Sequence, residues 1–321
     1  MTNITSRTET ITPEKAREYL SRNGRNRPIR KSQVNTLSQE MAAGRWMPNG
    51  EPIIFDEKDN LVDGQHRLSA CAKSGASFTT LVVRGVSESA IDTINTGRSR
   101  SGADVLGLNG VTNSGLTAAH VRWLVTYALG SAYNIHGAAG IIIPASLMPD
   151  LYTSLPQESH AAIRLTAGSK NFRRFMTPAT ASGVAALLMI ASAGSNAGTA
   201  FLDRVFKAEM LSPRTPEYAL HQGLVANASK ALARNRFSQS SLAQMVIRSW
   251  NAHVMDEELV TCRPGGQKSL CPLTMDDPRI AVTREYLLGY CSDDFRCLVG
   301  QIGESRRTIL AEYKAKNKQA Q

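Results

Sequence analysis

The stretch Asn60-Leu-Val-Asp-Gly-Gln-His-Arg-Leu-Ser-Ala70 carries the strongest structural signal in this chain. Its apolar pair at 61–62 is typical of a short strand, and Gly64 marks a tight turn directly behind it. The residues after the glycine have helical character up to Gly75, a residue that commonly ends helices. The pattern therefore predicts a strand, a glycine turn and a helix in immediate succession.

The helix start after this turn is typical of an anion site. The first N–H groups of a helix have no partner inside it, and the helix dipole favours negative charge at that end. His66 and Arg67 fall in this first turn, beside Gln65. We therefore expect Gly64, Gln65, His66 and Arg67 to bind phosphate.

Short strands and helices surround the turn. Thr12-Pro13-Glu14 has the cap, proline and acidic residue that open a helix. A hairpin turn is expected at 56–60, between two apolar runs. We predict helices at about 12–23, 31–43 and 65–74, with strands near 52–55, 60–62 and 78–84. This mixture defines an α+β fold class.

Farther along, the chain turns helical. A segment rich in Gly and Asn at 106–114 predicts a domain boundary. Apolar spacing after it predicts helices at 116–129, 183–193, 199–210, 216–235, 239–253 and 301–317. The predicted organisation is a flexible N-terminus at 1–10, an α+β domain at 11–110, and a mainly α-helical domain at 111–321 with an irregular C-terminal segment.

The charge of the chain predicts an acidic partner. Lysine and arginine number 37 against 27 acidic residues, which gives a net charge of +10. The basic residues cluster at 22–31, 98–100, 170–174 and 230–236 and in the C-terminal segment. No apolar stretch reaches the length of a membrane span, and no secretory signal opens the chain. These features favour DNA over a membrane as partner and a cytoplasmic location.

The cysteines predict neither disulfides nor a metal site. There are five, an odd number, and reduced thiols are the expectation for a cytosolic chain. Cys262 and Cys271 lie too far apart for a zinc ribbon, as do Cys291 and Cys297. Cys71 has the helix-face spacing of a small buried hydrophobe. No metal ligand set is therefore expected.

Gly64-Gln-His-Arg67 resembles the signature turn of the ParB/sulfiredoxin superfamily, which includes nucleotide-binding segregation proteins, sulfiredoxins and free-serine kinases. The upstream Asn26-Arg-Pro-Ile-Arg-Lys31 resembles the arginine-containing loop of that superfamily, and the likeness covers about residues 10–100. Asp63-Gly-Gln-His-Arg67, Asn95-Thr-Gly-Arg-Ser-Arg100 and Ser249-Trp-Asn-Ala252 are also similar to motifs of phage-encoded "ParB-like nuclease" proteins.

The resemblance implies a ligand and a setting. It implies that the turn holds the phosphates of a nucleoside triphosphate, ATP or CTP with Mg²⁺, with Arg67 as the main contact and Arg30 nearby. It also implies a phage or prophage protein in a bacterial host cell, and it leaves open whether the chain forms a homo-oligomer. Sulfiredoxins carry a reactive cysteine where this chain has Gln65, so sulfinic-acid repair is excluded.

Several roles remain open at this point. Three functional roles are open for Asp63: binding of a metal–nucleotide, orientation of Arg67, or action as a general base. The alternative is a structural role, in which its side chain only caps the tight turn. Four basic residues are candidates for DNA contact: Arg27, Lys31, Arg98 and Arg100. The favoured function is nucleotide-coupled DNA binding. The alternative is an NTPase or phosphotransferase acting on a small molecule or a modified base. A nuclease ranks last, because no acidic cluster for metal-assisted cleavage lies near the motif.

Overall fold

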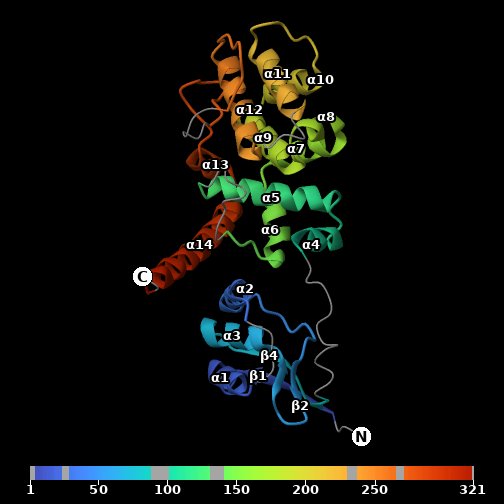
Figure 1. Cartoon of the computed structure of the whole chain (residues 1–321), viewed down its shortest axis with the longest axis vertical. Coiled ribbons are helices and arrows are strands. Elements are labelled where there is room, and N and C mark those ends of the chain that lie inside the picture. The colour runs from blue at the N-terminus through green and yellow to red at the C-terminus, as the bar shows by residue number, and fades with distance from the viewer. Residues whose placement is uncertain are drawn as a thin grey trace. The chain divides into compact units, whose positions relative to one another are not determined.

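The computed structural model describes residues 4–23, 29–87, 101–130, 141–229, 237–264 and 271–319. The chain forms two compact units, Met1–Ser99 (unit 1) and Arg100–Gln321 (unit 2) (Figure 1). The division lies before the predicted boundary. The segment at 106–114 belongs to unit 2, because it joins two helices, α4 (Gly102–Leu108) and α5 (Ser114–Ala128), that pack on each other there.

Unit 1 is built on a four-stranded sheet in the order β1-β4-β2-β3. Its strands are β1 (Thr5–Ile11), β2 (Ile53–Asp56), β3 (Leu61–Asp63) and β4 (Phe78–Val86). β2 and β3 form an antiparallel hairpin, and β2 runs parallel to β4 with Ile53 opposite Val82. A parallel pair needs a crossover, which α3 (Gln65–Ser74) supplies between β3 and β4. The strands and the helix predicted around the glycine turn are therefore confirmed.

The N-terminal segment is ordered where the sequence analysis expected flexibility. Residues 5–11 form β1, which pairs antiparallel with β4 from Thr5 opposite Arg84 to Ile11 opposite Phe78. Most of the side chains of β1 are exposed, and only that of Ile11 is buried. Because the strand is held by main-chain hydrogen bonds at the edge of the sheet, its polar sequence carries little sign of it.

Two further helices, α1 (Pro13–Ser21) and α2 (Lys31–Ala42), pack against α3. The predicted start of α1 is confirmed: Thr12 caps it by accepting a hydrogen bond from the N–H of Lys15. Tyr19 of α1 meets Phe55 of β2 edge-on, with ring centroids 4.9 Å apart. The core of unit 1 therefore lies between the sheet and the three helices, and the glycine turn lies at its margin.

The regular secondary structure described in unit 2 is helical, apart from a short β-bridge between Leu273 and Ala281. The described residues between Val254 and Arg284 are otherwise irregular. The helices are α4 (Gly102–Leu108), α5 (Ser114–Ala128), α6 (Met148–Thr153), α7 (Gln157–Gly168), α8 (Lys170–Phe175), α9 (Pro178–Ala191), α10 (Ala197–Lys207), α11 (Pro216–Ser229), α12 (Gln239–Val254), α13 (Arg284–Tyr290) and α14 (Asp293–Gln319). The helices predicted near 116–129, 183–193, 199–210 and 239–253 are confirmed, and that predicted at 216–235 is confirmed up to Ser229, where the described range ends. In contrast, α4, α6, α7, α8 and α13 were not predicted, and α14 begins earlier than expected. The α+β class is confirmed for the chain as a whole.

The almost fully buried helix α9 is the centre of unit 2. It packs on α5, α7, α10 and α12, and nearly all of its side chains are inaccessible to solvent. At its contact with α5, Nδ1 of His120 lies 3.0 Å from Oγ of Ser182. Nε2 of His120 has no hydrogen-bond partner among the described residues. Burial, with a smaller contribution from His160, lowers the pKa of His120 to about 3, so the ring is neutral at pH 7.

This histidine is expected to make the stability of unit 2 sensitive to mild acid. An unfolded His120 takes up a proton near pH 6.5, whereas the folded one resists protonation down to about 3. Above pH 6.5, His120 should therefore leave the free energy of unfolding unchanged. Well below pH 6.5, its contribution should lower that free energy by about 1.4 kcal/mol for each unit that the pH falls. Urea unfolding of the wild type and His120→Gln at pH 7, 6 and 5 measures this slope.

In the His120→Gln variant, the free energy of unfolding should no longer contain the pH dependence that comes from one proton bound by the unfolded chain. His221→Gln is the matched control, because the half-buried His221 has a carbonyl partner, Val205 O, 2.7 Å from its Nδ1. Equal pH slopes for the wild type and His120→Gln would refute the assignment.

Candidate functional site

Gly64 fixes the geometry of the turn between β3 and α3. It is the N-cap of α3 and has φ of 101° and ψ of 1°, in the left-handed region. A Cβ atom at this position would lie 2.3 Å from Cδ1 of Ile53 in β2. Both the backbone conformation and the space therefore require glycine. As a result, the first helical turn of α3 lies directly after the end of β3.

Arg67 lies inside the structure rather than on its surface. The residue is 6% exposed. Its guanidinium donates to the main-chain carbonyls of Glu51 and Pro52, which precede β2, and to Oδ2 of Asp63 at 2.9 Å. Thr80 of β4 donates to the same Glu51 carbonyl at 2.9 Å. Arg67 thus ties α3 to β2 and β3 through a buried, charge-assisted hydrogen-bond network.

This arrangement answers one question about Asp63 that the sequence left open. Its carboxylate holds the Arg67 guanidinium, so among its candidate roles the orientation of Arg67 is the one seen in the geometry. Arg67 was expected to be the main phosphate contact, and its described hydrogen bonds go to two carbonyls and a carboxylate. These contacts hold the turn in position, and phosphate contact by Arg67 stays a prediction.

Gln65 and His66 hold the two ends of the connection between α1 and α2. Nδ2 of Asn23, just after α1, donates to Oε1 of Gln65 at 3.2 Å. The main-chain N–H of Arg30, just before α2, donates to Nε2 of His66 at 3.0 Å. Because Nε2 accepts, the neutral ring carries its proton on Nδ1. A connection rich in arginine thus begins and ends at the first turn of α3.

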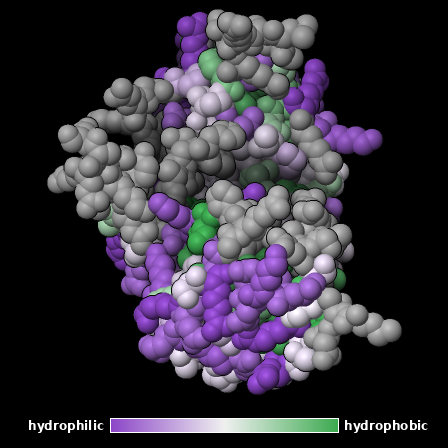
Figure 2. Space-filling view, turned by 60° about the horizontal axis from the view of Figure 1, so that its bottom comes forward, coloured by the Kyte–Doolittle hydropathy of each residue, from purple (hydrophilic) through white to green (hydrophobic). Residues whose placement is uncertain are grey.

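Arg30 and Lys31 are the exposed cations at this place. Both lie at the start of α2, and neither side chain has a carboxylate partner within the described ranges. The face of unit 1 in the lower part of Figure 2 is largely hydrophilic. Of the other candidates for DNA contact, Arg27, Arg98 and Arg100 lie outside the described residues. The structure therefore brings Arg30 and Lys31 to the motif and leaves the other three unplaced.

The single cysteine of unit 1 is structural. Cys71 of α3 is completely buried, and its Sγ lies 3.6 Å from the carbonyl oxygen of Ile11. Burial raises the pKa of this thiol to about 11, with a smaller contribution from the charge of Glu14. At neutral pH the group is a thiol and not the reactive thiolate, as the sequence predicted.

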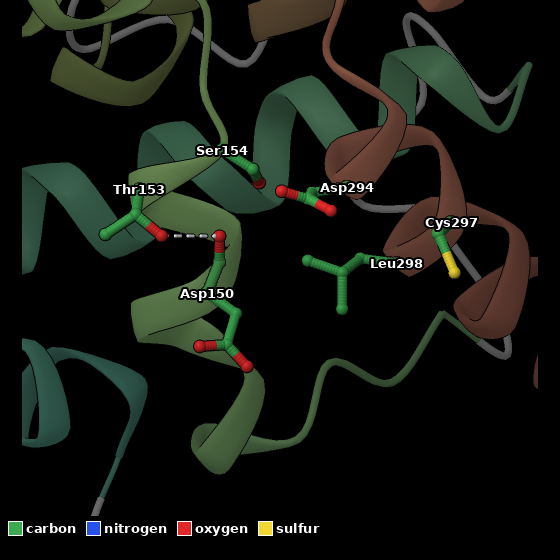
Figure 3. Close-up of a pocket in the computed structure, with 6 residues that line it drawn as sticks. All are labelled: Asp150, Thr153, Ser154, Asp294, Cys297 and Leu298. Atoms are coloured by element: carbon green, nitrogen blue, oxygen red, sulfur yellow. Dashed lines mark hydrogen bonds between the residues drawn. The ribbon is translucent and has the colours of Figure 1, made fainter.

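Unit 2 contains a separate pocket of about 460 Å³. Figure 3 shows its lining residues, which come from the region of α6 and from α14. They are Asp150, Thr153, Ser154, Asp294, Cys297 and Leu298. The pocket shares no residue with the glycine turn, and its two carboxylates make it unsuitable for a phosphate. In the part of the chain that the structure describes, no three His, Cys, Asp or Glu side chains are grouped to hold a metal ion.

Comparison with known proteins identified no relative of this chain. No family model, no curated protein and no solved structure matches the chain. Of the helices described, none has the length and apolar character needed to cross a membrane.

Proposed function

We propose that unit 1 is a ParB/sulfiredoxin-like domain that binds the phosphates of a nucleotide at the Gly64–Arg67 turn, and that the chain associates with DNA. One observation carries the proposal. The first turn of α3 is held at the end of β3 by a left-handed glycine, and the arginine-rich α1–α2 connection is fastened to it at both ends. By the same resemblance, we place the protein in the cytoplasm of a bacterial host, encoded by a phage or prophage.

Two groups of donors supply the binding. Main-chain N–H groups of a helix start attract an anion through hydrogen bonds and through the helix dipole. Arg30 and Lys31 add exposed positive charge beside them, free of carboxylate partners within the described ranges. Mg²⁺ enters as the counter-ion that accompanies a triphosphate. In this proposal, Arg30 and Lys31 at the start of α2 contact the phosphates, in place of Arg67.

The same geometry favours binding over phosphoryl transfer. A kinase needs a carboxylate to take the proton of the acceptor hydroxyl. Asp63, the carboxylate within the motif, is engaged by the Arg67 guanidinium. An enzyme that hydrolyses or transfers the terminal phosphate remains the second candidate. Release of ADP or CDP by the wild type, lost on removal of Arg30 and Lys31, would favour it.

Isothermal titration with ATP, CTP and GTP in the presence of magnesium tests the proposal. We expect one nucleotide to bind, and the double variant Arg30→Ala/Lys31→Ala to bind it at least about tenfold more weakly, since two charge-assisted contacts are lost. The matched control is Arg17→Ala on α1, an exposed arginine whose carboxylate partner is Glu14. It should bind like the wild type.

The double variant leaves the buried network of Arg67 intact, so circular dichroism should show an unchanged fold. If the wild type binds none of the three nucleotides, the nucleotide proposal fails, whatever its affinity for DNA.

A further inference from the structure

Exposed cations of unit 2 fall into two groups. In the first group each cation has a carboxylate within 4 Å: Arg204 with Glu217, Lys207 with Asp203, Arg214 with Glu258, Arg279 with Asp277, Arg284 with Glu285, Arg296 with Asp293 and Arg307 with Glu304. In the second group the cations have no carboxylate partner within the described ranges: Arg122 of α5, Arg164 of α7, Lys170 and Arg174 of α8, Arg248 of α12, and Arg263. Three of these, Arg164, Lys170 and Arg174, lie on the contacting helices α7 and α8. The second group therefore carries uncompensated charge.

The amino-acid sequence explains this separation. From Ser159 to Leu202 the chain contains no aspartate or glutamate, while it contains Arg164, Lys170, Arg173 and Arg174. A second stretch without acidic residues runs from Tyr218 to Met255 and contains Lys230, Arg234, Arg236 and Arg248. These two stretches therefore contain no carboxylate of their own that could pair with their cations.

The fold brings the two stretches together. The main-chain N–H of Thr177, just after α8, donates to Oε1 of Gln239 at the start of α12, at 2.8 Å. α8 packs on α7 and α11, and α9 packs on α12. Hydroxyl groups gather at the same junction, where Ser238 and Ser240 lie with their oxygens 2.7 Å apart. The end of α8 and the start of α12 therefore lie side by side, although they are distant in sequence.

The cations of α8 are displayed on a rigid base. Lys170 and Arg174 are four residues apart in one helix, so they lie on one face, where like charges repel. The guanidinium of Arg174 lies 5.4 Å from the ring centroid of Phe175, which is buried and packs near Phe206. Arg164, on the neighbouring α7, adds a third charge, and it contributes to the lowered pKa of His160 after burial. An extended polyanion would relieve this repulsion.

We infer that Arg164, Lys170 and Arg174, here called the α8 surface, bind the phosphate backbone of duplex DNA. The groups available are cations and hydroxyls, which contact phosphate and fix a protein on the duplex without reading its bases. The proposed function requires that the chain associate with DNA, and this inference assigns that contact to unit 2. It stands independently of nucleotide binding at the glycine turn.

Fluorescence anisotropy of the full-length chain with two unrelated 30-base-pair duplexes tests the assignment. The triple variant Arg164→Gln/Lys170→Gln/Arg174→Gln should bind both duplexes at least about tenfold more weakly than the wild type. The slope of log affinity against log salt should also fall by about 2 to 3, since each lost phosphate contact contributes about 0.9.

The matched control removes the same amount of charge from the same unit. Arg214→Gln/Arg279→Gln/Arg284→Gln changes three exposed arginines that already have carboxylate partners. It should change affinity by less than about threefold, since only long-range steering is lost. Equal losses in the two triple variants would overturn the inference, because net charge alone would then explain them.

Two further outcomes separate this inference from the proposed function. Titration with nucleotide should give the same affinity for the α8-surface variant as for the wild type, so failure at one site leaves the other testable. If Arg30→Ala/Lys31→Ala abolishes DNA binding while the α8-surface variant retains it, the DNA contact belongs to unit 1 and the inference is wrong.

Discussion

Replacing Arg67 by alanine is expected to lower the free energy of unfolding of unit 1 by about 3 to 5 kcal/mol. The guanidinium is buried and donates to two main-chain carbonyls and to Asp63. Its removal leaves a carboxylate and two carbonyls without those donors in a poorly solvated place, and unsatisfied buried acceptors are costly. Urea unfolding measures the loss, and hydrogen exchange assigns it to peptides of unit 1.

Two companion variants make this result specific. Arg17→Ala removes an exposed arginine that pairs with Glu14, and its effect should stay within about 0.5 kcal/mol. Asp63→Asn keeps an oxygen acceptor for Arg67 but removes the charge, so we expect a loss smaller than that of Arg67→Ala. An Arg67→Ala protein as stable as the wild type would show that the guanidinium is not engaged as described.

The position of Arg67 also changes how nucleotide-binding data should be interpreted. An Arg67 variant that fails to bind nucleotide has lost the support of the turn, whether or not the side chain touches phosphate. Variants at Arg30 and Lys31 are the informative ones, because their side chains are exposed at the start of α2.

Replacing Gly64 by alanine is expected to destabilise unit 1 by about 2 to 5 kcal/mol. A left-handed conformation costs a residue with a Cβ atom about 1 to 3 kcal/mol. Forcing the new methyl group against Cδ1 of Ile53, 2.3 Å away, adds about 1 to 3 kcal/mol of overpacking. Chemical denaturation of the two proteins measures the sum.

Gly75→Ala separates the two contributions. Gly75 also has a positive φ, of 74°, but a Cβ atom there would meet nothing within 4 Å. It should therefore show the backbone cost alone. In the Gly64→Ala background, Ile53→Val removes the clashing Cδ1 atom and should recover part of the loss. Equal costs for Gly64→Ala and Gly75→Ala, with no recovery, would rule out the steric contribution.

The local structure around the motif was predictable, because turn chemistry is local. Gly64 and Gly75 predict where α3 begins and ends, and the polar run at 56–60 predicts the hairpin. Asp56 accepts hydrogen bonds from the N–H groups of Lys58 and Asn60 in that turn, as aspartate does in such positions. These contacts span few residues, so the sequence pattern contains them.

The contacts that build the site were not predictable in the same way. The acceptors of Arg67 at Glu51 and Pro52 are main-chain carbonyls, which every residue carries and no sequence pattern distinguishes. Asn23 was missed for a related reason, since its partner Gln65 is 42 positions away in the chain. β1 was taken for a flexible end because an edge strand with one buried side chain reads as polar sequence.

The charge on α8 shows an intermediate case. The basic cluster at 170–174 is visible in the sequence. Its lack of counter-charges becomes apparent only when the partners of the other cations of unit 2 are known, because arginines such as Arg204 are neutralised by residues from other helices. The sequence shows where the charged residues are, and only the fold shows which of them have no partner of opposite charge.

The hydrogen bonds of Asn23 and Arg30 end on consecutive residues of α3, Gln65 and His66. The end of α1 and the start of α2 therefore share one anchoring point, although seven positions separate Asn23 from Arg30 in the chain. A substitution that displaces the first turn of α3, such as Gly64→Ala, should loosen both contacts together. Faster amide hydrogen exchange at the end of α1 and at the start of α2, in the same variant, would be its signature.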